Sequence, residues 1–143
     1  MKADILVIDT GNDIVGVYSV GDNQFKPYRG TAIVDALTRI ETVAEIVTYN
    51  GNCYDLDNMA KFAQSAGARF TLKGKHTDMC EICWSPRIRG SSLENTFKMQ
   101  FMIAPPSFPD SYEGNCERDV YMTYQLWLAW KDGSLRILDG HER

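Results

Sequence analysis

The first 28 residues constrain the fold most, because they read as three short strands joined by tight turns. Residues 4–9 form an apolar run that ends in an aspartate, and residues 13–20 alternate between apolar and polar side chains. Turn-forming glycines and asparagines separate these runs from each other and from a third short strand at 25–28. Because strands joined by such short turns pair antiparallel, the chain is predicted to open with a three-stranded antiparallel meander.

The rest of the chain is predicted to alternate between helices and strands. In chain order, the expected elements are a helix at 31–44, a strand at 46–49, a helix at 55–64, a strand at 68–72, helices at 77–84 and 95–99, a proline-rich loop at 104–110, a long helix at 111–130 and an edge strand at 134–138. The predicted apolar face of the long helix consists of Val120, Tyr124, Trp127 and Leu128. This order favours an α/β fold with a mixed sheet and helices on both faces.

Length, charge and hydropathy limit the classes of function. With 143 residues, the range 1–143 is expected to form a single domain. The net charge of −4 argues against broad, non-specific adhesion to nucleic acid. The N-terminal apolar run is too short for a secretion signal or a membrane span, so we expect a cytoplasmic location and no membrane partner. The four cysteines are then expected to be thiols.

Three aspartates lie where predicted elements begin or end, so side chains from distant segments have the chance to meet. Asp9 ends the first strand, Asp55 opens a helix, and Asp119 lies near the start of the long helix. Two-metal cleavage of a phosphodiester needs converging carboxylates, because Mg²⁺ prefers hard oxygen ligands. Taken singly, each aspartate also has an ordinary explanation, such as a helix N-cap for Asp55. Their joint pattern favours a metal site.

The segments around these aspartates resemble the motifs of the DEDD family of 3′–5′ exonucleases, which has a ribonuclease H-like fold. Asn50 and Asp55 match the second motif, an asparagine five residues before an aspartate. Residues 115–120, Asn-Cys-Glu-Arg-Asp-Val, resemble the third motif, Tyr-Cys-x-x-Asp-Val. Residues 76–79 and 91–93 are similar to a linking segment of polymerase-associated members.

This resemblance implies an enzyme that shortens single-stranded DNA or RNA from its 3′ end. Asp9, Asp55 and Asp119 would hold Mg²⁺ or Mn²⁺ in a two-ion site, and a polymerase, helicase or other replication or repair protein is the expected partner. The residues expected to contact the nucleic acid are Thr10, Asn50, Arg69, Lys73, Lys75 and His76, the last four from a basic stretch that continues with Arg87, Arg89 and Lys98. A solvated loop is the alternative interpretation of this basic stretch.

Two positions depart from the family pattern. Gly11 stands where the first motif, Asp-x-Glu, has its glutamate. Asn115 and Gly114 stand where the third motif has a tyrosine or a histidine that orients the attacking water. Asn115 is counted as a catalytic candidate because it can hydrogen-bond a water, although asparagine cannot act as a general base. Asp13 and Tyr112 are the candidate replacements for the missing groups.

These departures leave other functions open. An inactive ribonuclease H-like module that binds nucleic acid or a partner protein is the first alternative. A second follows from Asp9-x-Gly11 and the later Gly16, which are similar to the opening hairpin of Holliday-junction resolvases and would imply an endonuclease. A third is a zinc-stabilised interaction domain built on Cys80, Cys83 and His76. Zinc is not expected, because a lone Cys-x-x-Cys is weak evidence and free cysteines usually pack as small apolar residues.

Overall fold

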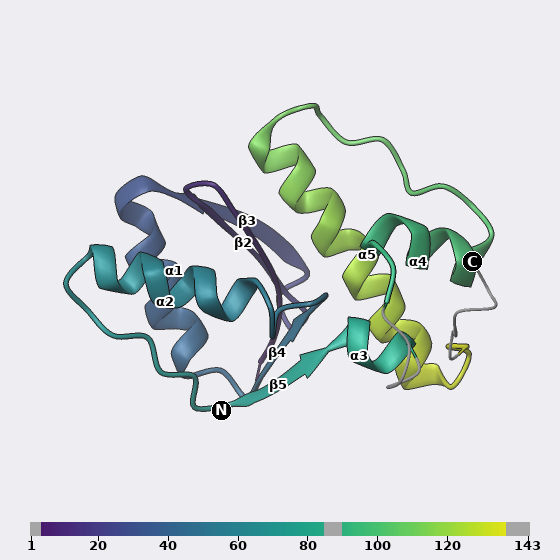
Figure 1. The fold of residues 1–143 in the computed structure, drawn as a ribbon, viewed down its shortest axis with the longest axis horizontal. Helices are drawn as coiled ribbons and strands as arrows, with labels where there is room; N and C mark the ends of the chain where they lie inside the picture. Colours follow the sequence, from purple (N-terminus) through teal and green to yellow (C-terminus); the bar gives the residue numbers. More distant parts are fainter. Residues whose placement is uncertain (1–3, 85–89, 137–143) are drawn as a thin grey trace.

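The structure is a computed structural model that describes residues 4–84 and 90–136. Its elements are β1 (Ile5–Gly11), β2 (Ile14–Ser19), β3 (Gln24–Arg29), the short 3-10 helix η1 (Gly30–Ala32), α1 (Ile33–Glu41), β4 (Glu45–Thr48), α2 (Asp55–Ser65), β5 (Lys75–Asp78), α3 (Met79–Cys83), α4 (Leu93–Phe101) and α5 (Tyr112–Asp132). The strands form one five-stranded sheet in the order β3-β2-β1-β4-β5 (Figure 1).

The sheet is mixed, and β1 lies at its centre. β1 pairs antiparallel with β2, and β2 pairs antiparallel with β3, so the predicted opening meander is confirmed. On its other side β1 pairs parallel with β4, which in turn pairs parallel with β5. The ends of three parallel strands, β1, β4 and β5, therefore meet at one edge of the sheet.

Helices cover both faces of the sheet, as predicted (Figure 1). Leu6 and Ile8 of β1 are buried in the core under α1 and α2, whereas Val7 is buried in the core under α5. Burying each such aliphatic side chain stabilises the fold by about 1.5–3 kcal/mol. Because successive side chains of a strand alternate between faces, Asp9 lies on the α5 side of the sheet with Val7, and Thr10 lies on the α2 side.

The predicted strand at 68–72 is wrong, because that segment pairs with no strand. Its backbone is tied to the end of α1 instead: Thr71 N donates to Glu41 Oε2 at 3.3 Å, and Lys73 N donates to Glu41 O at 3.2 Å. The strand that completes the sheet is β5, Lys75–Asp78. Its sequence, Lys-His-Thr-Asp, has no apolar alternation, so only its parallel pairing with β4 identifies it.

Two predicted helices have shifted boundaries. The helix expected at 77–84 begins at Met79, because Thr77 and Asp78 complete β5. The helix expected at 95–99 extends over Leu93–Phe101, with the Ser92 hydroxyl accepting from Asn95 N at 3.2 Å as its N-cap.

Among the described residues no helix combines the length and apolar character needed to span a bilayer.

The C-terminal helix α5 is the longest helix, as predicted, but its buried face differs from the predicted one. Leu128 is 36% exposed, whereas Met122 and Leu126 are fully buried. The expected edge strand at 134–138 is wrong for its described part: residues 134–136 form no strand, and Arg136 N instead donates to Gln100 Oε1 at 3.0 Å. Residues 137 and 138 lie outside the described residues.

Candidate functional site

The ends of the three parallel strands gather polar side chains at one edge of the sheet. Asp9 lies near the end of β1, Asn50 and Asp55 follow β4, and Asp78 ends β5. In sheets of this kind the carboxyl ends of parallel strands border the crevice in which ligands bind. This edge is therefore where the fold concentrates its candidate chemistry.

The helix α5 reaches the same edge because it packs closely on β2. Gly16 lies opposite Asp9 in the register of β1 and β2. A Cβ atom on Gly16 would be only 2.2 Å from Cys116 Sγ, so the absence of a side chain is what lets α5 approach. Cys116 Sγ donates to Asp9 O at 3.5 Å, and Asp119 follows almost one helical turn later on the same side. Gly16 thus has a packing function here.

Burial and like charge raise the pKa of the Asp9 carboxyl group well above its usual value. Burial is the largest cause, followed by the charges of Asp119 and Asp55. The interaction between the two carboxyl groups raises the pKa of Asp9 and lowers that of Asp119, so it favours the proton on Asp9. Burial also raises the pKa of Asp119, which the guanidinium of Arg118 partly opposes. The structure therefore brings together the three aspartates that the sequence singled out.

Asp55 is held by a short hydrogen-bond network. Its Oδ1 accepts from Thr10 N at 3.2 Å and from Thr10 Oγ1 at 2.5 Å, and Asn58 Nδ2 donates to Thr10 Oγ1 at 2.9 Å. The side chain is only 4% exposed and makes no N-cap bond, since the N-cap residue of α2 is Tyr54. Burial raises the pKa of Asp55 to about 6, although the bonds from Thr10 oppose the shift.

Asp78 is a residue that sequence reasoning missed, and it shapes the loop beside the aspartates. Its Oδ1 accepts from Asn50 N at 2.6 Å and from Cys80 N at 3.0 Å, and its Oδ2 accepts from Asn52 N at 3.3 Å. Asn50 has a left-handed backbone with φ of 63°, a conformation that asparagine tolerates better than most residues. The available sequence signal was an aspartate at the N-cap of α3.

A cleft of about 530 Å³ opens over this edge of the sheet. It is lined by residues that include Asp9, Asp119, Tyr49, Asn50, Cys53 and Leu93. Tyr49 is fixed in the wall of the cleft, because its hydroxyl donates to Ser91 O at 2.6 Å. The cleft therefore exposes two of the three aspartates to a bound molecule.

The candidates for the missing family groups are exposed on the surface. Asn115 is exposed on α5, and Tyr112 is 57% exposed, with its ring 5.0 Å from the guanidinium of Arg29. Asp13 is exposed in the turn between β1 and β2. Gly11, by contrast, lies two residues after Asp9 on the same strand, so a side chain there would share its face.

The basic stretch lies at the other end of the sheet. Lys75 pairs with Glu45, and Glu45 pairs with Ile5 at the start of β1. The offset from Ile5 to Asp9 along the strand corresponds to about 13 Å. Arg69 and Lys73 are exposed in the connection that leads into β5, so the structure does not bring these cations to the aspartates.

His76 and Lys98 do not line the cleft that Asp9 and Asp119 share. His76 Nε2 is hydrogen-bonded to Thr48 Oγ1 at 2.8 Å, and burial lowers the pKa of this histidine. Lys98 is exposed on α4. Arg87 and Arg89 lie outside the described residues.

The donor chemistry of the site suits a hard divalent cation better than zinc. Burial raises the pKa of the Cys83 thiol to about 12, which opposes the thiolate form that zinc requires. The carboxylates of Asp9, Asp55 and Asp119 are the oxygen ligands that Mg²⁺ and Mn²⁺ prefer. Within residues 4–84 and 90–136, however, no group of three His, Cys, Asp or Glu side chains is already arranged to hold a metal ion.

Comparison with known proteins identifies the family of the chain. The sequence model of the RNase H superfamily matches residues 9–139. The chain belongs to the RNase H superfamily. The ribonuclease H-like fold expected from the aspartate motifs is therefore confirmed, and the chain is a nuclease-like module.

One solved structure illustrates the likeness in fold. The family B DNA polymerase from the hyperthermophilic archaeon Pyrobaculum calidifontis superposes on this RNase H-superfamily chain with a TM-score of 0.62 at 14% sequence identity. The match covers 92% of this chain and 24% of the polymerase, so the chain spans about a quarter of that protein. At this identity the likeness shows the fold alone. A comparison with curated proteins found no match.

Proposed function

We propose that this chain is a 3′–5′ exonuclease-like phosphodiester hydrolase that uses divalent metal ions. The observation that carries the proposal is the convergence of three carboxylates from β1, α2 and α5, close enough for Asp55 and Asp119 to raise the pKa of Asp9. The repulsion between these buried carboxylates is relieved when a proton or a cation binds to them. Carboxylate oxygens are hard ligands, so the preferred cations are Mg²⁺ and Mn²⁺.

Each residue has a distinct part in this proposal. Asp9 and Asp119 line the cleft and would hold the cation side by side. Thr10 and Asn58 fix the direction of Asp55, so that carboxylate is oriented before a ligand arrives. When bound, the ions would activate a water and stabilise the leaving oxygen. Asn50 lines the cleft and is proposed to contact the end of the strand.

The nucleic acid is proposed to run from the cleft along the molecule. Lys75 is offset from Asp9 by about 13 Å along the strand direction, and Arg69 and Lys73 lie in the connection that leads into β5, so we propose that these cations contact phosphates away from the strand end. Because the polymerase from Pyrobaculum calidifontis contains this fold within a longer chain, a polymerase is the first partner class to test.

Gly11 is expected to make the activity weak. The family glutamate at this position would lie on the same face as Asp9 and add a fourth carboxylate. A Cβ atom on Gly11 would lie 3.2 Å from Ile14 Cγ2, so a small shift of that side chain would accommodate a larger residue. Gly11→Glu combined with Asn115→Tyr is therefore expected to raise cleavage if the site has merely lost these two groups.

A second candidate function is a module that binds nucleic acid or a partner protein without cleaving it. The observation that favours it is the exposure of Asn115 on α5, together with the missing carboxylate at Gly11. The family position that orients the attacking water holds Asn115, which cannot act as a general base. This candidate predicts binding that persists in the presence of a chelator.

The test is cleavage of 5′-labelled single-stranded DNA and RNA with Mg²⁺ or Mn²⁺. We expect stepwise shortening from the 3′ end that is abolished by Asp55→Asn and by Asp119→Ala. Asp57→Asn is the matched control, because Asp57 lies in the same first turn of α2 but pairs at the surface with Lys61 at 2.9 Å. A single internal cut would replace the exonuclease with an endonuclease, and binding without cleavage would favour the second candidate.

A further inference from the structure

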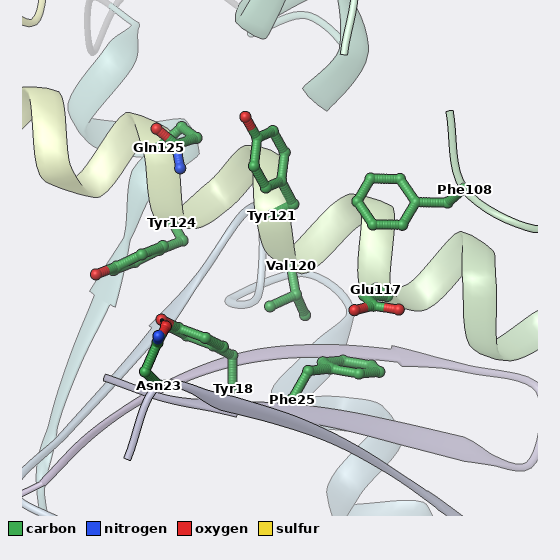
Figure 2. A pocket seen from close by; sticks show the side chains of 9 residues that line it. All are labelled: Tyr18, Asn23, Phe25, Phe108, Glu117, Val120, Tyr121, Tyr124 and Gln125. Atoms are coloured by element: carbon green, nitrogen blue, oxygen red, sulfur yellow. Dashed lines mark hydrogen bonds between the residues drawn. The ribbon is translucent and has the colours of Figure 1, made fainter. Parts of the chain in front are cut away.

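A second pocket lies on the side of α5 that faces away from Asp119. Glu117, Tyr121 and Tyr124 of α5 line it at spacings of four and three residues, so they share one face of the helix. Asp119 is two residues after Glu117, which places it about 200° around the helix. The β2–β3 hairpin supplies the opposite wall, and the pocket has a volume of about 320 Å³ (Figure 2).

Aromatic rings from three separate segments line this pocket. Tyr18 and Phe25 come from the hairpin, Tyr121 and Tyr124 come from α5, and Phe108 comes from the loop before α5 (Figure 2). The rings of Tyr18 and Tyr124 have centroids 4.7 Å apart, and those of Phe108 and Tyr121 have centroids 5.9 Å apart. Such surfaces favour a flat, aromatic ligand that can stack on them.

The polar groups in the pocket narrow the chemistry of that ligand. The Glu117 carboxylate lies between the rings of Phe25 and Phe108 in Figure 2, and it makes no hydrogen bond with the described part of the chain. The side chain of Gln125 also lines the pocket and likewise has no hydrogen-bond partner among the described residues. Because a carboxylate only accepts hydrogen bonds, a ligand that contacts Glu117 has to donate one to it.

We propose that this pocket binds an unpaired cytosine base of a single-stranded nucleic acid. The base would stack on the aromatic rings and donate its exocyclic amine to Glu117, the pairing by which acidic side chains recognise cytosine. Thymine and uracil have a carbonyl oxygen in place of that amine, so the carboxylate repels them. The proposal rests on the proposed function for its class of ligand, but it concerns binding and requires no metal ion.

The test is the affinity of labelled oligodeoxycytidylate and oligothymidylate of equal length, measured by fluorescence anisotropy with a metal chelator present. The wild-type chain is expected to bind the cytosine oligomer more tightly. Phe108→Leu removes a stacking surface from a loop outside any helix or strand, and should weaken binding of the cytosine oligomer between about 5-fold and about 100-fold. Glu117→Leu should abolish the preference between the oligomers while retaining binding.

The control is Tyr112→Ala, which removes an exposed tyrosine on the same helix outside this pocket and should leave the preference intact. Equal affinity of the wild type for the two oligomers, or an unchanged preference in Glu117→Leu, would overturn the proposal. So would self-association in sedimentation that Phe108→Leu abolishes, because the occupant would then be a second copy of the chain. A preference for the cytosine oligomer without any cleavage would refute the proposed hydrolase activity but would still support cytosine binding in this pocket.

Discussion

Replacing Gly16 by alanine tests whether close packing of α5 on β2 places Asp119 beside Asp9. The added methyl group would lie 2.2 Å from Cys116 Sγ and 3.0 Å from a ring carbon of Phe25. Ordinary contacts between such atoms are about 3.5–4.0 Å, so either α5 or the strand must move by about 1 Å or more. A displacement of that size at a catalytic group can lower the rate about 100-fold.

The expected cost in stability follows from two opposing effects. Overpacking of a filled core costs about 1–3 kcal/mol. Alanine also restricts the unfolded chain, which stabilises the protein by about 0.4–1 kcal/mol where the backbone is compatible, as at this residue with an extended conformation. Since the 2.2 Å contact is far below van der Waals distance, overpacking should win, with a net loss of about 1–2 kcal/mol.

The decisive comparison is the double variant Gly16→Ala with Cys116→Ala. Removing Cys116 Sγ vacates the space that the new methyl group requires, so the exchange nearly conserves volume and the double variant should be close to wild type. Urea unfolding followed by tryptophan fluorescence measures stability, and cleavage of a labelled oligonucleotide measures placement of Asp119. Gly11→Ala is the matched control on β1, because its methyl group would meet only Ile14 Cγ2, at 3.2 Å.

The reasoning fails if Gly16→Ala is neutral. It also fails if the two substitutions add without coupling, because residues in contact should show an interaction energy of about 0.5–3 kcal/mol. Loss of cleavage in Gly16→Ala that the double variant restores would link the packing of α5 to the placement of Asp119.

Three further predictions follow from the same edge of the sheet. With metal ions chelated, Asp55→Asn should stabilise the protein above pH 6 by about 2–3 kcal/mol. The reason is that burial raises the pKa of Asp55 in the folded state from 3.8 to about 6. The wild type is therefore most stable below pH 3.8 and loses this part of its stability as the pH rises through 6. Urea unfolding at a series of pH values should show this loss of stability in the wild type and not in the variant. Asp78→Ala should cost about 1–3 kcal/mol in urea unfolding, because three backbone N–H donors lose their acceptor. Mn²⁺ should raise the Tm of the wild type in calorimetry but not that of Asp119→Ala, and an equal rise in both would place the ion elsewhere.

Much of the fold was predictable because it is encoded in local periodicity. The alternation along β1 and β2, with tight turns between the strands, specified the meander. The helical spacing of apolar residues specified α1, α2 and α5 within a few residues. The sequence also placed Asp9, Asp55 and Asp119 at element ends, and the resemblance to exonuclease motifs indicated that they meet.

What local periodicity could not provide was the outcome of non-local packing. The polar strand β5 exists only because β4 offers it a parallel partner, so neither the strand nor the loop-shaping Asp78 had an apolar signal. Lys75 begins β5 whereas Asp9 lies near the end of β1, so the two are separated, although the sequence led us to expect that both act on the same nucleic acid.

The sequence by itself determined most of the strands and helices, with β5 as the exception, since the side chains of those segments carry that information. Only the tertiary structure decided the properties of the site. The contacts of Cys116 with Gly16 and with Asp9 join residues that are 100 and 107 positions apart in the chain, and they bring Asp119 to the sheet. The raised pKa values of Asp9 and Asp55 likewise arise from burial and neighbouring charge, which exist only once these distant segments have packed together.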